Sequence, residues 1–330
     1  MKILLTAEFF LSGQSTHVLD LAVQLRQLGH TVKIIFINIH TSIFSEYYDP
    51  MLKKARIKYY HTSNKTKIAQ ITRRFQPDII HSHSSTIFNL TKNLAEITQT
   101  PYLVTCHGLG FSHMKYRKSL QNAERIITVG VNSAREILPL YKDKVIIIPN
   151  GIDIHRFKPA KKATVFNVYY VGRIDWSKVY PLKELKKAVD KITHIRLIVV
   201  GNWQPPIKEI DFVPWQPRIE NILKTANIVI GCGRSAREAL ACGCAVFLMN
   251  TKYDGLIDEI LTQEPNFDFS GNIGRFNYDK LYQDLFSLIS NRKRLSQVQN
   301  FSRQFAESSL SSLEMTKKIL AVYEEILFSS

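Results

Sequence analysis

Short apolar runs alternate with longer amphipathic stretches along the first half of the chain. The runs are rich in β-branched residues, which is typical of strands covered on both faces of a sheet. Seven strands are predicted here: Lys2–Ala7, Thr31–Ile37, Ile57–Tyr60, Ile79–His81, Tyr102–Cys106, Arg125–Val129 and Val145–Ile148. The stretch Thr16–Leu28 carries one broad apolar stripe, and Gly29 follows it as a helix stop. Repeated strand–helix units predict a doubly wound, parallel α/β sheet.

The second half of the chain repeats this pattern. Its predicted strands are Phe166–Val171, Arg196–Val200, Ile228–Ile230 and Ala245–Met249. Its predicted helices are Pro181–Ile192, Ile219–Thr225, Ser235–Ala241, Tyr278–Ile289 and a last one at Leu313–Leu327. A length of 330 residues is enough for two domains that each bury a core. We expect a tight link between them at 150–159.

Composition indicates a globular protein without a membrane span. Apolar residues make up 45% of the chain, yet no window approaches the roughly 20 apolar residues that a span needs. The start resembles a strand that soon meets Glu8, not a signal peptide, so we expect a cytoplasmic protein. Cys106, Cys232, Cys242 and Cys244 are expected to be reduced thiols, because no histidine stands at zinc-finger spacing from them.

The formal net charge of +16 is unevenly spread. Between residues 51 and 74 there is no acid, and there are eight cations: Lys53, Lys54, Arg56, Lys58, Lys65, Lys67, Arg73 and Arg74. Phe111–Lys118 interleaves aromatic residues, predicted to be exposed, with more cations. A solvated face is the simplest interpretation. The alternative is an anionic membrane surface at the inner face of the membrane. We do not expect a nucleic-acid partner, because no nucleic-acid-binding motif accompanies the charge.

Three candidate sites follow predicted strands. Gly13 precedes a helix, where a glycine and a helix N-terminus can approach an anion, although the G-x-G-x-x-G fingerprint is absent and an ordinary turn is the alternative. His81-x-His83 and the segment Thr105-Cys106-His107-Gly108 stand at strand ends, where open sheets place their ligands. A structural role is the alternative for such histidines. No metal site is predicted, because the His-x-His pair lacks identifiable further ligands.

The remaining candidates lie at and after the midpoint of the chain. The segment Val145–Asp153 ends in Pro-Asn-Gly-Ile-Asp, and the first strand of the second half is followed by Gly172-Arg173 and then Lys178. Two cations after a strand can neutralise a departing diphosphate, or they can be solvated surface charges. Further on, a glycine loop at 231–233 opens a helix that carries Glu238. The loop can hold a phosphate oxygen, and a carboxylate can bind a diol.

These motifs, in this order, resemble the family 4 glycosyltransferases of the GT-B class, whose segments read PNGID…F and GR…K. The resemblance implies two doubly wound Rossmann-like domains facing a central cleft. They would be an acceptor-side domain at 1–155, a nucleotide-sugar-binding domain at 156–310, and a C-terminal helix at 311–330 that returns to the first domain. It further implies a hexosyltransferase-like enzyme that retains the anomeric configuration.

The resemblance also implies residue roles. His107 matches the histidine of T-x-H-G beside the donor sugar and is expected to be catalytic, together with Arg173 and Lys178. The expected donor-binding residues are Gly13, Gly233, Arg234, Ser235 and Glu238. Glu238 matches the second glutamate of the E-x7-E motif, which grips the nucleotide ribose. The first glutamate is missing, because Ile230 stands eight positions earlier and the neighbouring Gly231 and Cys232 supply no carboxylate.

The expected function is transfer of a sugar from a nucleotide diphosphate donor to a hydroxyl acceptor, such as a glycan or a lipid-linked acceptor in cell-envelope polysaccharide or glycolipid synthesis. We expect no cofactor and no metal, because Arg173 and Lys178 supply positive charge and no clear D-x-D is present; the nearest run is Glu209–Asp211. Two alternatives remain: a nucleotide-sugar epimerase of the same fold, and a non-catalytic nucleotide-sugar-binding partner subunit, which the missing glutamate favours.

Overall fold

The computed structural model describes residues 1–328 and divides into two compact units. The first unit consists of Met1–Gly151 and the helix that begins at Ser312, and the second consists of Ile152–Ser311. The sequence predicts boundaries at 155/156 and 310/311. The observed boundary after Gly151 lies inside the linking segment expected at 150–159.

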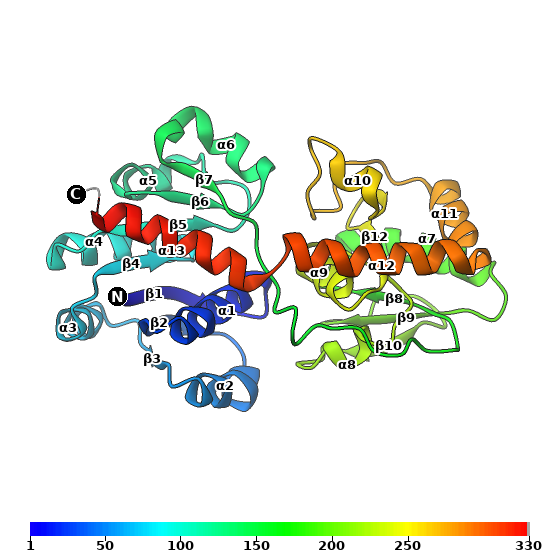
Figure 1. Cartoon of the computed structure of the whole chain (residues 1–330), viewed down its shortest axis with the longest axis horizontal. Helices are drawn as coiled ribbons and strands as arrows, with labels where there is room; N and C mark the ends of the chain where they lie inside the picture. The colour runs from blue at the N-terminus through cyan, green and yellow to red at the C-terminus, as the bar shows by residue number, and fades with distance from the viewer. Residues whose placement is uncertain (329–330) are drawn as a thin grey trace. The chain divides into compact units, whose positions relative to one another are not determined.

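The first unit is built on a parallel sheet of seven strands in the order β3-β2-β1-β4-β5-β6-β7 (Figure 1). The strands are β1 Lys2–Phe9, β2 Thr31–Ile39, β3 Lys58–His61, β4 Ile79–Ser82, β5 Tyr102–Cys106, β6 Ile126–Thr128 and β7 Val145–Ile147. The seven predicted strands are confirmed, with ends that shift by one or two residues. Their apolar side chains fill a core on each face of the sheet.

Helices cover both faces of this sheet. The first face is covered by α1 (Gly13–Gln27), α2 (Asp49–Lys54) and α13 (Ser312–Phe328). The second face is covered by α3 (Lys65–Phe75), α4 (Phe88–Thr98), α5 (Arg117–Asn122) and α6 (Val131–Tyr141). Helix α1 begins three residues before its predicted start, because the Ser12 hydroxyl accepts from the Ser15 N–H and caps it. Gly13 is therefore the first helical residue rather than part of a loop.

Short helical turns link these elements. The first unit has a π-helical turn, η1 (Phe44–Tyr48), and 3₁₀ turns η2 (Ser85–Ile87), η3 (Met114–Tyr116) and η4 (Lys142–Lys144). The second unit has one such 3₁₀ turn among its described residues, η5 (Trp176–Lys178).

The second unit is built on a six-stranded sheet in the order β10-β9-β8-β11-β12-β13. The strands are β8 Asn167–Val171, β9 Arg196–Gly201, β10 Asp211–Pro214, β11 Ile228–Gly231, β12 Ala245–Met249 and β13 Tyr253–Leu256. The last strand pairs antiparallel with β12. The edge strands β10 and β13 were both absent from the prediction. The other pairs are parallel.

Helices again cover both faces of this sheet. Buried side chains of α7 (Val179–Asp190) and α11 (Tyr278–Ser290) pack on one face, and those of α8 (Glu220–Leu223) and α9 (Gly233–Ala241) pack on the other. Helix α12 (Arg292–Ser309), which the sequence pattern did not predict, contributes to both cores, and α10 (Glu259–Gln263) follows β13. Within residues 1–328, no helix combines the length and apolar character that a bilayer crossing needs.

Both sheets reverse their strand order at one point. In the first unit β4 lies beside β1, and in the second unit β11 lies beside β8. Open α/β sheets bind ligands outside the carboxyl ends of the strands at such a switch point. The two groups of predicted site residues follow these strands, so each unit brings its own group to one edge of its sheet.

Candidate functional site

The loop after β8 carries the two predicted diphosphate-binding cations. The Gly172 N–H donates to the Val200 carbonyl, and the Ile174 N–H donates to the Asn202 Oδ1 at 2.7 Å, so β9 and its following residue hold this loop in place. The Lys178 ammonium donates to the Arg173 carbonyl at 2.7 Å. Arg173 is exposed and Lys178 is half-buried. The loop therefore presents one exposed guanidinium and a lysine that is bound to the same backbone.

Asp175 lies between these cations in the chain and interacts with both. The Ser177 hydroxyl and N–H donate to its carboxylate and hold the Asp175 pKa below its usual range, and the charges of Lys178 and Arg173 lower it further. The charged Asp175 carboxylate partly offsets the mutual repulsion of the two cations, so they can lie close together before any ligand binds.

The loop after β11 fits tightly against β8. A side chain at Gly231 would place its Cβ 2.6 Å from the Val171 carbonyl, so only glycine fits there. Gly233 has a φ of +59°, and its N–H donates to the Phe269 carbonyl. No side chain caps the start of α9, where Cys232 is the N-cap residue. The first turn of α9 can therefore offer backbone N–H groups to an anion, with the Gly233 N–H already engaged.

One turn into α9, Glu238 forms an ion pair with Arg234. The Arg234 Nε donates to the Glu238 Oε1 at 2.7 Å, and the two side chains are 15% and 10% exposed. Both residues were predicted to bind the donor independently. The structure brings them together, so the guanidinium fixes the orientation of the carboxylate.

Arg237 is a buried cation that the sequence analysis missed. Its guanidinium packs over the Phe269 ring at 4.1 Å, and its Nε is buried without a hydrogen-bond partner in the structure of residues 1–328. Burial, and then the charge of Arg234, lower the pKa of Arg237 to about 10. A buried cation whose hydrogen bonds are incomplete is costly unless an anion joins it. The available signal was its position in a helix whose neighbours Ala236, Ala239 and Leu240 are apolar.

Cys232 shows that the two loops of the second unit meet. Burial raises the pKa of its thiol, while the positive charges of Lys178 and Arg237 act in the opposite direction. Lys178 follows β8 and Arg237 lies in α9, so the charges of cations from both segments act on one side chain. The edge of the sheet at β8 and β11 therefore concentrates positive charge.

The two positions where a further carboxylate was sought lie away from these loops or carry no acid. Ile230, at the position of the missing first glutamate, is fully buried in the core of β11. Asp211, the end of the nearest D-x-D-like run, lies in the outermost strand β10 and forms an exposed ion pair with Arg196 at 3.5 Å. Neither position adds a carboxylate to the loops after β8 and β11.

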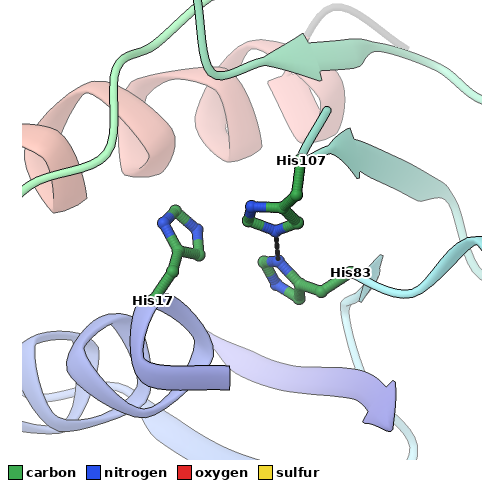
Figure 2. A group of neighbouring side chains, drawn as sticks. All are labelled: His17, His83 and His107. Atoms are coloured by element: carbon green, nitrogen blue, oxygen red, sulfur yellow. Dashed lines mark hydrogen bonds between the residues drawn. The ribbon is translucent and has the colours of Figure 1, made fainter. Parts of the chain in front are cut away.

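In the first unit, the predicted histidines divide into two kinds. His81 is fully buried, with its Nδ1 2.6 Å from the Tyr323 hydroxyl and its Nε2 2.7 Å from the Thr105 hydroxyl, so it ties β4 to β5 and α13. His83 instead lies with its Nδ1 3.4 Å from the Nε2 of His107. His17, which the sequence analysis missed, joins them from α1 (Figure 2). Gly13 lies one turn before His17 in the same helix.

One of the two basic segments, Phe111–Lys118, differs from the prediction. Phe111 is buried against Phe88 and Tyr116, so the expectation of an exposed aromatic there was wrong. The exposed apolar side chains in and just before this segment are Met114 and Leu109, at 68% and 70%. In the chain, the exposed residues Lys115, Arg117 and Lys118 follow them.

Comparison with solved structures identifies the class of fold. Two sheets of this topology, each with a switch point, define the GT-B fold, and a glycosyltransferase from Rickettsia africae has it with a TM-score of 0.79 at 20% identity, over 100% of this chain and 99% of that one. An Anabaena protein, Alr3699/HepE, solved in complex with UDP and glucose, matches with a TM-score of 0.75 at 14% identity, over 98% of this chain and 100% of that one.

Sequence comparison gives the family resemblance. Residues 11–156 match the family model described as Glycosyltransferase Family 4, which confirms the resemblance over that part of the chain. A relative from Escherichia coli, UDP-Gal:alpha-D-GlcNAc-diphosphoundecaprenol alpha-1,3-galactosyltransferase, is 27% identical over 244 residues. The match covers 56% of this chain and 62% of the relative, which is less than two thirds of its length.

Proposed function

We propose that this chain transfers a sugar from a nucleotide diphosphate donor to a hydroxyl acceptor. The observation that carries the proposal is the second unit's concentration of cations at the carboxyl ends of β8 and β11. There the adjacent strands β8 and β11 end side by side, Arg173 shares a loop with Lys178, and Arg237 lies in α9, whose N-cap residue makes no side-chain capping hydrogen bond. A diphosphate is the anion that needs several fixed positive groups in one place.

Each group has a defined task in this proposal. A leaving nucleoside diphosphate accumulates negative charge, and preformed cations lower the barrier to its departure. Arg173 and Lys178 supply this charge, which makes a divalent ion unnecessary. The first turn of α9 binds a phosphate oxygen, and Glu238, oriented by Arg234, accepts hydrogen bonds from the ribose hydroxyls. His107 keeps the catalytic role that the family resemblance implies, and transfer retains the anomeric configuration.

The comparisons guide the choice of substrates to test. The Escherichia coli relative is named for UDP-galactose and a lipid diphosphate acceptor, and the Anabaena structure contains UDP and glucose. We therefore propose a UDP-hexose donor and a lipid-linked acceptor in cell-envelope glycan synthesis.

A lipid-linked acceptor fits the two basic segments of the first unit, residues 51–74 and 111–118. Leu109 and Met114 are exposed, the exposed residues Lys115, Arg117 and Lys118 follow them in the chain, and the segment 51–74 adds more cations. At a membrane interface, such apolar groups enter the headgroup region while lysines and arginines meet anionic lipids. Reversible binding at the inner membrane face would bring the enzyme to its acceptor.

A donor-consumption assay separates this proposal from its alternatives. A thermal-shift screen of UDP-, GDP- and ADP-sugars first finds the donor that stabilises the chain. Consumption of that donor only when an acceptor is present supports a transferase, whereas conversion to another nucleotide sugar without acceptor supports an epimerase. Binding without consumption in either case supports the non-catalytic partner that the buried Ile230 favours.

A further inference from the structure

Three histidines from separate segments meet at the switch point of the first unit. His17 comes from the second turn of α1, His83 follows β4, and His107 follows β5 (Figure 2). Because β1, β4 and β5 are adjacent parallel strands, the segments that follow them reach the same edge of the sheet. One ring nitrogen of each histidine lies within 4.8 Å of the others.

The spacing of two of these nitrogens suits two ligands of one ion. The His83 Nδ1 and His107 Nε2 are 3.4 Å apart, which is long for a hydrogen bond between them. Two nitrogens bound to a tetrahedral zinc ion at about 2.0–2.1 Å are about 3.3–3.4 Å apart. The pair therefore already has the separation that a shared ion requires, and His17 approaches from the remaining side with a ring centroid 4.7 Å from that of His107.

His83 and His107 contact each other through one ring nitrogen each, and only their outer nitrogens lack the hydrogen bonds that hold a structural histidine. Both nitrogens of His81 are occupied by hydroxyl groups, and its ring packs against His83 with a centroid separation of 4.0 Å. By contrast, the Nε2 of His83 and the Nδ1 of His107 are buried without a partner in the described part of the chain. His81 thus supports the group from behind and is not one of its ligands.

The ligand type limits the choice of metal. Three imidazoles favour zinc, copper, nickel or iron, whereas magnesium and calcium prefer oxygen ligands.

We propose that His17, His83 and His107 bind one divalent transition-metal ion of the zinc class. Three protein ligands leave a fourth tetrahedral position for water or for an anionic oxygen, as in open zinc sites. This inference concerns binding alone and does not depend on sugar transfer.

Calorimetry on the full chain tests the site. The chain is prepared without a histidine tag, dialysed against chelator and titrated with zinc chloride. We expect one tight site per chain, a higher melting temperature with zinc and no change with magnesium. Cobalt at the same site should give the intense visible absorption of tetrahedral coordination. Only weak absorption, typical of octahedral cobalt, would overturn the proposal.

Variants locate the ion. His17→Ala and His83→Ala should each weaken zinc binding by at least roughly tenfold, because each removes a ligand. His155→Ala, an exposed histidine in the second unit, should bind zinc like the wild type. Unchanged affinity in both cluster variants, with circular dichroism showing that they are folded, would overturn the site even if zinc binds elsewhere. The assay needs no donor or acceptor, so its failure leaves the proposed function untouched.

Discussion

The Arg234 guanidinium donates from Nε to Oε1 of Glu238 at 2.7 Å, one helical turn away in α9. The same pair geometry occurs in α12, where the Arg303 Nε donates to the Glu307 Oε1 at 2.7 Å. The two pairs differ in burial, because Glu238 is 10% exposed and Glu307 is 49% exposed. This difference places Glu238 where a ligand can be bound away from water.

Glu238→Gln should weaken nucleotide binding more than it affects the fold. The amide keeps the shape but loses charge-assisted hydrogen bonds worth roughly 1.5–3 kcal/mol, about ten- to hundredfold in Kd. Calorimetric titration with the free nucleoside diphosphate measures the change. Glu307→Gln is the matched control and should bind like the wild type. Equal nucleotide affinity in both variants would remove Glu238 from the donor site.

Arg237→Met should lower donor affinity without lowering stability. Methionine fills a similar volume against Phe269, and removal of a buried cation is often neutral or stabilising for the fold. The melting temperature of the ligand-free variant should therefore equal or exceed that of the wild type. Nucleoside diphosphate affinity should fall by roughly tenfold or more, since one charged contact is lost. Unchanged affinity would show that this guanidinium does not face the phosphates.

Turnover should persist in excess EDTA after dialysis. In the proposed site, Arg173 and Lys178 supply the positive charge for the diphosphate, so magnesium or manganese has no necessary place there. Loss of activity that either of these ions restores would contradict this part of the account. Restoration by zinc alone would place the requirement at the His17, His83 and His107 cluster instead.

The chain should co-sediment with anionic vesicles and release them at high salt. Each lysine or arginine near such a surface contributes roughly 1 kcal/mol, and salt screens the attraction. Charge reversal is made by changing four exposed lysines of the first unit to glutamate: Lys53, Lys54, Lys115 and Lys118. This variant should lose most vesicle binding.

The control for vesicle binding makes the same change in charge in the second unit. It changes four exposed lysines to glutamate: Lys183, Lys208, Lys252 and Lys293. If both variants bind equally, net charge rather than the two basic segments of the first unit governs association. Equal binding of the wild type to neutral and anionic vesicles at low salt would rule out the membrane proposal.

Most strands could be predicted because they are buried on both faces and carry continuous apolar runs. β13 could not, because Tyr253-Asp254-Gly255-Leu256 contains an acid and a glycine, and its strand conformation depends on pairing with β12. Helix α12 was missed for a related reason. It buries the small residues Ser302 and Ala306, so its apolar stripe is weak in the sequence.

Local motifs located the site residues of the second unit but not their partners. Arg234 and Glu238 were predicted as separate ligand contacts. Their spacing of four residues in a helix nevertheless predicts an ion pair, which the structure contains. His17 was not identified because it lies within the apolar stripe of α1. Its contact with His83 and His107 depends on the adjacency of β1, β4 and β5 in the sheet. His81 owes its structural role to Tyr323, which lies 242 positions along the chain.

The proposed function requires that the cations after β8 promote departure of a nucleoside diphosphate during sugar transfer. The direct measurement is the rate of formation of glycosylated acceptor, by mass spectrometry, for the wild type, Arg173→Ala and Lys178→Ala. Arg196→Ala, which removes an exposed arginine in the same unit, is the control. We predict transfer by the wild type and the control, and a loss of roughly a hundredfold or more in each cation variant. Near-wild-type rates in both variants would exclude this role for the two cations, and no transfer by the wild type with any donor that stabilises it would exclude the proposed function.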